Sequence, residues 1–203
     1  MSTFRFENNI KLDKDIEEEF DNLSHVIEDT SSDIRTIAIT SSQSGEGKTF
    51  ISFHLACSLA RKGYRVAIVM ADMRKTTQKD NKSVMGVLDI VEGKVELENV
   101  IYNTDIEGID VIFSGATKKR ESINKDKKVY SVMIKALKED YNYIIVDMPT
   151  FNKTEDDNIL LKAADAGILV IEPNRSSIGK LKKNIKLMEH NNCRVLGAVV
   201  NNK

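Results

Sequence analysis

Two glycines, a lysine and a threonine stand close together in this chain, with the spacing of a phosphate-binding loop. The stretch follows an apolar run over residues 35–40 and reads Ser42-Gln43-Ser44-Gly45-Glu46-Gly47-Lys48-Thr49. Glycines let the backbone turn several N–H groups toward one anion, and the first turn of a following helix adds the positive end of its dipole. The stretch therefore predicts a nucleotide triphosphate site. The alternative is a glycine-rich loop without a ligand.

The chemistry predicted for this loop is phosphate and magnesium binding. Lys48 would neutralise terminal phosphate charge, and the Thr49 hydroxyl would ligate Mg²⁺. Ser42 stands where the usual pattern has a glycine, so the match is to the core of the motif. The predicted nucleotide contacts are Ser44, Gly45, Glu46, Gly47, Lys48, Thr49 and Phe50.

Two further apolar runs end in carboxylates. Residues 65–70 lead into Asp72 and Arg74, and residues 143–146 lead into Asp147. Because the carboxyl ends of parallel strands line one edge of a sheet, we expect both acids beside the loop. Each acid taken alone is equally typical of a turn at a strand end.

The two acids and the arginine receive separate predicted roles. Asp147 is expected to hold the Mg²⁺ shell, through water, because Mg²⁺ keeps most of its hydration. Asp72 is a second candidate metal ligand at the same edge. Arg74 would assist the phosphate charge or form a salt bridge at the strand end. The predicted catalytic set is Lys48, Asp72 and Asp147.

The order of apolar segments predicts an α/β fold, with a doubly wound, mostly parallel sheet and helices on both faces. At 203 residues the chain suits one such domain. We expect residues 1–14 to be a flexible segment and 15–203 the nucleotide-binding domain. Predicted helices span 15–29, 49–62, 83–91, 129–140, 156–164 and 176–190, and predicted strands 65–70, 109–113, 143–147, 167–171 and 194–200. In the first helix, Ile16, Phe20, Leu23 and Ile27 form the expected buried stripe.

Composition excludes several classes of function. The net charge of −1, from 30 basic and 31 acidic residues, offers no general attraction to nucleic acid or anionic lipid. The two cysteines, Cys57 and Cys193, lack metal-ligand spacing. No apolar run approaches the ~20 residues of a membrane span. We therefore expect a cytoplasmic protein without membrane insertion. The three histidines, His25, His54 and His190, are expected to be surface or helix residues without a role.

These motifs together resemble the bacterial tyrosine kinases that regulate capsule and exopolysaccharide synthesis. That family is a branch of the partition and division-site ATPases, which have a deviant phosphate loop. The resemblance rests on Gly-Glu-Gly-Lys-Thr, on Ala-Asp-Met-Arg after an apolar run, and on an apolar run ending in Asp-x-Pro. It extends through segments 86–89, 111–115, 165–170 and 195–201. Partition ATPases carry a signature lysine where this chain has Gln43, which favours the kinase branch.

The resemblance implies ATP and Mg²⁺ as cofactors and transfer of the γ-phosphate to protein tyrosines. It also implies a membrane activator or chain-length regulator as partner, recruitment to the inner face of the membrane, and a homo-oligomer. Relatives build that oligomer with Glu-x-x-Arg-x-x-Arg, where this chain has Glu18, Asp21 and Ser24. The two guanidinium forks of that motif are therefore absent here.

Two other departures keep three classes of function open. Relatives carry an Asp where this chain has Met70, and a thioether neither accepts a proton nor binds Mg²⁺ usefully. Relatives also end in a cluster of tyrosines, whereas the last tyrosine here is Tyr143. The three classes are an ATP-dependent protein-tyrosine kinase, an ATP-binding regulator without transfer chemistry, and a partition-type ATPase.

Overall fold

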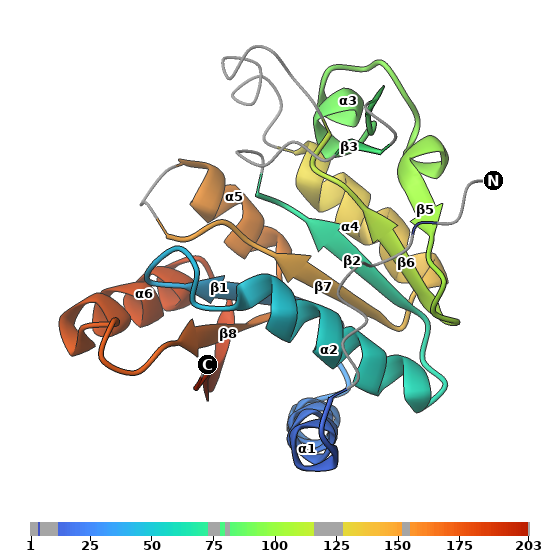
Figure 1. Cartoon of the computed structure of the whole chain (residues 1–203). Coiled ribbons are helices and arrows are strands. Elements are labelled where there is room, and N and C mark those ends of the chain that lie inside the picture. Colours follow the sequence, from blue (N-terminus) through green and yellow to red (C-terminus); the bar gives the residue numbers. More distant parts are fainter. Residues whose placement is uncertain are drawn as a thin grey trace.

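A seven-stranded sheet forms the centre of the molecule (Figure 1). The computed structural model describes residues 4, 12–72, 78–79, 82–115, 128–151 and 155–202. The strand order is β5-β6-β2-β7-β1-β8-β9, and only β5 runs antiparallel to its neighbour. The strands are β1 Thr36–Ser41, β2 Val66–Met70, β5 Ile101–Asn103, β6 Ile109–Ile112, β7 Tyr143–Asp147, β8 Ala166–Ile171 and β9 Arg194–Val200. The predicted doubly wound, mostly parallel sheet is confirmed.

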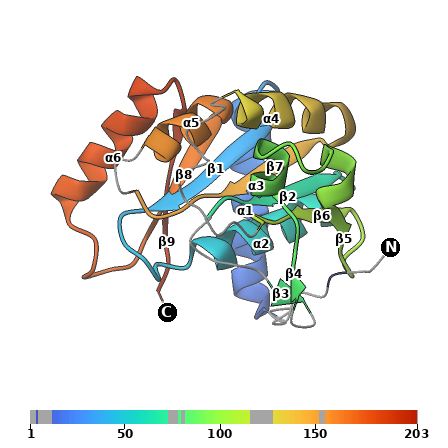
Figure 2. The same cartoon turned by 90° about the horizontal axis from the view of Figure 1, so that it is seen from above.

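Helices cover both faces of this sheet. Figure 2 shows α4, α5 and α6 on one side and α1 and α2 on the other. The helices are α1 Lys14–Thr30, α2 Lys48–Arg61, α3 Val87–Val91, α4 Val129–Asp140, α5 Glu155–Ala163 and α6 Ile178–His190, with a 3₁₀ turn at Leu97–Val100. A two-stranded hairpin pairs β3 Gln78–Lys79 with β4 Lys82–Ser83. Across the described ranges, no helix has both the length and the apolar character that crossing a membrane requires.

The alternation of side chains along each strand divides the core into two clusters. In β1, Ile37 and Ile39 pack in the cluster beneath α1 and α2, whereas Ala38 packs in the cluster beneath α4 and α5. All six residues of β1 are buried. A strand covered on both faces reads as a continuous apolar run, which is why this run was recognisable in the sequence.

The buried stripe of α1 differs from the prediction. Phe20 and Ile27 are buried as expected, but Ile16 is 43 % exposed and Ser24 is fully buried. The Ser24 hydroxyl donates to the carbonyl of Asp21 at 2.8 Å and accepts from Ser58 of α2 at 3.1 Å. Because serine is small and its hydroxyl is hydrogen-bonded, α1 can approach α2 closely at Ser24. The face of α1 that packs on α2 is therefore partly polar.

The helix predicted over 83–91 is shorter, because it begins at Val87. The Val87 and Leu88 N–H groups donate to the carbonyls of Phe113 and Ser114, at 2.9 and 3.0 Å. A Cβ on Gly86 would lie 2.0 Å from the Phe113 oxygen, so only glycine permits this approach. Segments 86–89 and 111–115, both noted for their resemblance to the kinases, therefore lie against each other.

Phe4 lies in the segment predicted to be flexible, residues 1–14, but its backbone is hydrogen-bonded to the rest of the fold. Its N–H donates to Asn103 of β5 at 2.8 Å, and its carbonyl accepts from Asp105 at 3.1 Å. Its ring lies 4.7 Å from that of Phe113. Phe4 therefore packs at the β5 side of the sheet.

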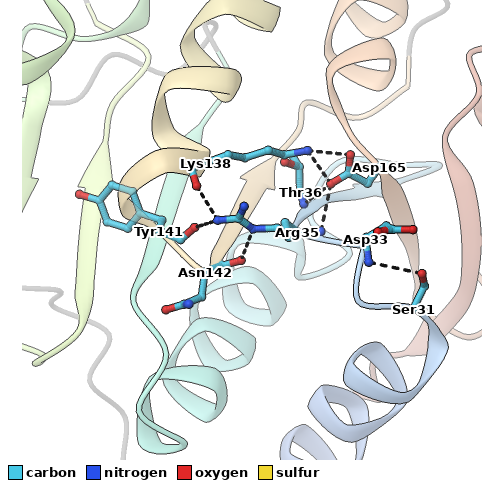
Figure 3. Close-up of polar contacts among 8 residues, drawn as sticks. All are labelled: Ser31, Asp33, Arg35, Thr36, Lys138, Tyr141, Asn142 and Asp165. Atoms are coloured by element: carbon cyan, nitrogen blue, oxygen red, sulfur yellow. Dashed lines mark hydrogen bonds and ion pairs between the residues drawn. The ribbon is translucent and has the colours of Figure 1, made fainter.

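A polar cluster joins α4 to the amino ends of three strands (Figure 3). Asp165 accepts hydrogen bonds from the backbone N–H groups of Arg35 and Thr36 at 3.0 and 2.7 Å. The Lys138 ammonium of α4 lies 2.8 Å from the same carboxylate. The Arg35 guanidinium donates to the carbonyl of Asn142 at 3.2 Å. The cluster thus fixes where β1, β7 and β8 begin.

Candidate active site

Three strand ends meet at one edge of the sheet, as predicted for the two acids and the loop. β7 lies between β1 and β2, and Asp147 is in register with Ile39 on one side and Met70 on the other. Beyond β2, the Ala71 N–H still donates to the Asp147 carbonyl at 2.9 Å. Asp72 follows directly and is half-buried. This edge of the sheet therefore carries, in spatial order, Asp72 after β2, Asp147 at the end of β7 and the loop after β1.

The loop between β1 and α2 has the backbone of an anion-binding turn. Gly45 and Gly47 have φ angles of +83° and +96°, which side-chain-bearing residues rarely adopt. α2 begins at Lys48, and the Ile51 N–H donates to the Gly47 carbonyl at 3.0 Å. The helix N-terminus and the turned backbone thus lie together, which is the arrangement that attracts phosphate.

Lys48 is held within the site. Its side chain is 9 % exposed, and Nζ donates to Ser41 Oγ at 3.1 Å and to Thr150 Oγ1 at 3.3 Å. Ser41 ends β1 and Thr150 follows β7, so the ammonium lies between the two strand ends. The two hydroxyl groups place the ammonium where a phosphate at the loop would meet it.

Thr49 and Asp147 are in direct contact. Thr49 Oγ1 donates to Asp147 Oδ2 at 2.6 Å, and Asp147 is 2 % exposed. Within the ranges that the structure describes, no group of three or more His, Cys, Asp or Glu side chains forms a metal cage. One hydroxyl and one carboxylate, completed by phosphate and water, are a donor set that suits Mg²⁺. These residues therefore fit the predicted metal.

The second motif is only partly described. Met70, which stands where relatives carry an acid, is partly buried and packs on the cluster beneath α1 and α2. Its thioether thus contributes to the core. Arg74, predicted to assist at the phosphates, lies outside the described residues.

Phe50 and His54 pack against α1. The Phe50 ring centroid lies 4.3 Å from that of His54 and 6.1 Å from that of Phe20. The sequence analysis expected His54 at the surface or in a helix; it lies in α2 and is 6 % exposed. Burial, with the Arg61 charge nearby, lowers the pKa of His54 from 6.5 to about 4. His54 is therefore a neutral core residue at pH 7.

Residues distant in sequence hold the loop from its other side, and sequence reasoning missed them. Their contacts reach Ser42, Ser44 and Glu46. Asn201 Nδ2 donates to the Glu46 carbonyl at 3.0 Å, Arg175 Nη2 to the Ser44 carbonyl at 3.3 Å, and Asn184 Nδ2 to Ser42 Oγ at 2.9 Å. The Ser176 hydroxyl donates to the Glu46 carboxylate. The one signal in the sequence was the family-like segment 195–201, which ends at Asn201.

A groove of about 930 Å³ lies beside the loop. It is bounded by α1, the first turn of α2 and the edge strand β9, and its lining includes Leu23, Phe50, Val200 and Asn201. It reaches Gly47, so one end of the groove touches the phosphate loop.

The fold and the site define a phosphate-loop nucleotide-binding protein. The pattern of the AAA domain family matches residues 34–196. The tyrosine-protein kinase CpsD of Streptococcus pneumoniae serotype 4 is 30% identical over 180 residues, which cover 85% of this chain and 79% of that protein. CpsD of Streptococcus agalactiae serotype III is 29% identical, over 93% of this chain and 83% of that one. The chain belongs to this family of bacterial tyrosine kinases.

Solved structures agree with this assignment. The chimerical protein CapA2B2 superposes with a TM-score of 0.79 at 28% identity, covering 92% of this chain and 84% of that chain. The septum site-determining protein MinD of Pyrococcus horikoshii OT3, complexed with Mg-ADP, gives a TM-score of 0.70 at 25% identity, over 82% and 70%. The fold is thus shared with CapA2B2 and with MinD.

Proposed function

We propose that this chain transfers the γ-phosphate of ATP to tyrosine hydroxyls of proteins, in the regulation of capsule or exopolysaccharide synthesis. The observation that carries the proposal is the Thr49–Asp147 contact of 2.6 Å beside Lys48, at the end of a phosphate loop. The reaction itself is inferred from membership of the bacterial tyrosine kinase family. The relatives that are named tyrosine-protein kinases match this chain over most of their own length.

The residues of the site have distinct roles in this proposal. Lys48 and the loop N–H groups hold the β- and γ-phosphates, and Thr49 with Asp147 holds Mg²⁺. The bound ion neutralises charge on the phosphates. Asp72 orients the acceptor hydroxyl in line with the γ-phosphate. Because phosphoryl transfer passes through a loose transition state, positioning and charge neutralisation supply most of the catalysis.

We propose that none of the five tyrosines in this sequence is the acceptor. All five tyrosines of the sequence lie in described segments, and none is exposed. Tyr130 and Tyr141 are each 4 % exposed, and the Tyr141 hydroxyl donates to Asp110 Oδ2 at 2.8 Å. The Tyr102 hydroxyl donates to the Met85 carbonyl at 3.2 Å. These side chains are engaged in the fold, which disfavours each of them as the acceptor.

A membrane-associated activator and a second copy of this chain are the partners that we propose. The support is the family resemblance together with the similarity to the chimerical protein CapA2B2. In this proposal the chain is cytoplasmic, and the activator recruits it to the inner face of the membrane.

A phosphotyrosine immunoblot tests the proposed function. The chain is incubated with Mg-ATP and a glutamate–tyrosine copolymer, with and without the cytoplasmic segment of a candidate activator. We expect phosphotyrosine with the unaltered chain and none with Lys48→Met. The variant Met70→Asp restores the acid that relatives carry. Phosphotyrosine with that variant alone would instead support a regulator without transfer chemistry.

A further inference from the structure

We propose that Glu46 is a positioning residue, whose carboxylate ties the phosphate loop to the segment between β8 and α6 and thereby sets the affinity for the nucleotide. The inference rests on the proposed nucleotide site but not on transfer to tyrosine. It also revises the role expected for Glu46 from the sequence, where the residue was grouped with the nucleotide contacts.

The two left-handed glycines determine where the Glu46 side chain goes. Glu46 lies between Gly45 at φ +83° and Gly47 at φ +96°, and it is fully buried. Its Oε2 accepts from the Gln43 N–H at 2.8 Å, which closes the turn of the loop. Its Oε1 accepts from the Ser176 hydroxyl. Both carboxylate oxygens are therefore occupied by groups of the protein.

A carboxylate at this place needs a structural reason. Burying a charge is costly unless hydrogen bonds compensate, and a negative charge beside a polyphosphate site repels the ligand. Glu46 therefore disfavours nucleotide binding through its charge alone. Its benefit must come from the two hydrogen bonds, which fix the loop in the conformation that binds phosphate.

The segment that Glu46 reaches contacts the loop at several further points. Arg175, next to Ser176, donates through Nη2 to the Ser44 carbonyl at 3.3 Å, and its own carbonyl accepts from the Gln43 side chain. Glu172 holds the guanidinium through Nη1 at 2.6 Å. Asn201, at the end of β9, donates to the Glu46 carbonyl at 3.0 Å. Among these contacts, only the Glu46 carboxylate joins the turn of the loop to Ser176.

The substitutions Glu46→Ala and Glu46→Gln separate hydrogen bonding from charge. Alanine removes both acceptors and leaves the Gln43 N–H and the Ser176 hydroxyl without this partner. Glutamine keeps one acceptor oxygen, and its NH₂ group can donate a hydrogen bond to the Ser176 hydroxyl. If Glu46 acts by hydrogen bonding, glutamine restores the affinity. If it acts instead as an anionic ligand of the bound nucleotide complex, glutamine fails as alanine does.

The experiment measures the Kd for Mg-ATP by calorimetry. We expect Glu46→Ala to weaken binding by about tenfold, the effect of losing a hydrogen bond to a charged group. Glu46→Gln is expected to remain within about threefold of the unaltered chain on the same grounds. Ser176→Ala should also weaken binding. The double variant, Glu46→Ala with Ser176→Ala, should bind no more weakly than Glu46→Ala alone, because both substitutions remove the same contact. Glu139→Ala, an exposed acid on α4, is the matched control.

Each other result would overturn the proposal. These results are unchanged affinity in Glu46→Ala, equal loss in Glu46→Ala and Glu46→Gln, or additive losses in the double variant. Thermal unfolding of each variant is measured alongside, and if Glu46→Ala does not fold, Glu46→Gln and Ser176→Ala decide by the same criteria. Where tyrosine transfer is observed, Glu46→Ala should raise KM for ATP and leave kcat within about twofold, since positioning acts on binding. Absence of tyrosine transfer in the unaltered chain would reject the proposed function and leave this binding test intact.

Discussion

Thr49 Oγ1 donates a 2.6 Å hydrogen bond to Asp147 Oδ2, which joins the first turn of α2 to the last residue of β7. The two residues are 98 positions apart in the sequence. Their contact exists because β1 and β7 are neighbours, so the loop that follows β1 reaches the end of β7. A hydroxyl and a carboxylate brought together in this way are the two hard ligands that the proposed Mg²⁺ site needs.

Lys48→Met is expected to abolish ATP turnover while the fold is retained. The substitution removes the ammonium that lies between Ser41 and Thr150, and a thioether offers no charge to a phosphate. Turnover is measured as phosphate release and as phosphotyrosine, with circular dichroism as the test of the fold. Lys180→Met, on the exposed face of α6, is the control and should retain turnover. Full activity in Lys48→Met would reject the phosphate-loop assignment.

Gly47→Ala is expected to weaken Mg-ATP binding by at least about tenfold. Its φ of +96° is strained for alanine, and the new Cβ would lie 2.2 Å from Asn201 Nδ2. Asn201 would then have to move and lose its hydrogen bond to Glu46.

Gly63→Ala separates the two effects in Gly47→Ala. Gly63 has φ +87°, and no atom lies within 4 Å of the place that a Cβ would occupy, so alanine there costs only the backbone strain of about 1–2 kcal/mol. Both variants should unfold at lower temperature, and only Gly47→Ala should lose nucleotide affinity. Equal affinities in the two variants would contradict the role assigned to the Asn201 contact.

His54 is expected to make stability depend on pH between about 6.5 and 4. Burial lowers its pKa in the folded state to about 4, so in this interval the unfolded chain binds the proton more tightly than the folded chain does. The contribution of His54 is thus complete above pH 6.5 and falls as the pH decreases, by up to about 3 kcal/mol at pH 4. Urea unfolding at a series of pH values measures this slope.

Two substitutions identify the group responsible for that slope. His54→Phe keeps an aromatic ring among Phe20, Phe50 and Phe53 and cannot be protonated. Its stability should vary less between pH 6.5 and 4 than that of the unaltered chain. His190→Gln, at the exposed end of α6, should keep the full slope. A slope unchanged by His54→Phe would assign the dependence to other groups.

Asp165→Ala is expected to lower the free energy of unfolding by about 3 kcal/mol. The substitution leaves the N–H groups of Arg35 and Thr36 without their acceptor and removes the partner of the Lys138 ammonium. Chemical denaturation measures the loss, with Asp140→Ala at the exposed end of α4 as the control. Since the cluster lies at the amino ends of the strands, nucleotide affinity in native buffer should stay within about twofold of that of the unaltered chain. A large loss of affinity would mean that the two edges of the sheet are coupled.

The parts of the site that were predictable are those fixed by short stretches of sequence. The glycines and Lys48 form a local motif, and Asp147 ends an apolar run whose last four residues, including Asp147, are buried in β7. A parallel sheet then brings the strand ends together without further information. For these reasons the juxtaposition of Lys48, Thr49 and Asp147 was open to prediction.

The remaining features depend on tertiary contacts that leave no local pattern. Glu46 and Ser176 are 130 residues apart, and Glu46 and Asn201 are 155 apart, so no spacing rule connects them. The start of α3 at Val87 depends on carbonyls at the end of β6. The burial of His54 depends on α1, whose Phe20 packs against it.

The central claim, that the loop and Asp147 bind a magnesium nucleotide, is tested most directly by calorimetric titration with ATP in the presence and absence of Mg²⁺. We expect saturable binding that Mg²⁺ strengthens, that Asp147→Asn makes insensitive to Mg²⁺, and that Lys48→Met removes. Heats no larger than those of dilution, or equal binding by all three chains, would contradict the account.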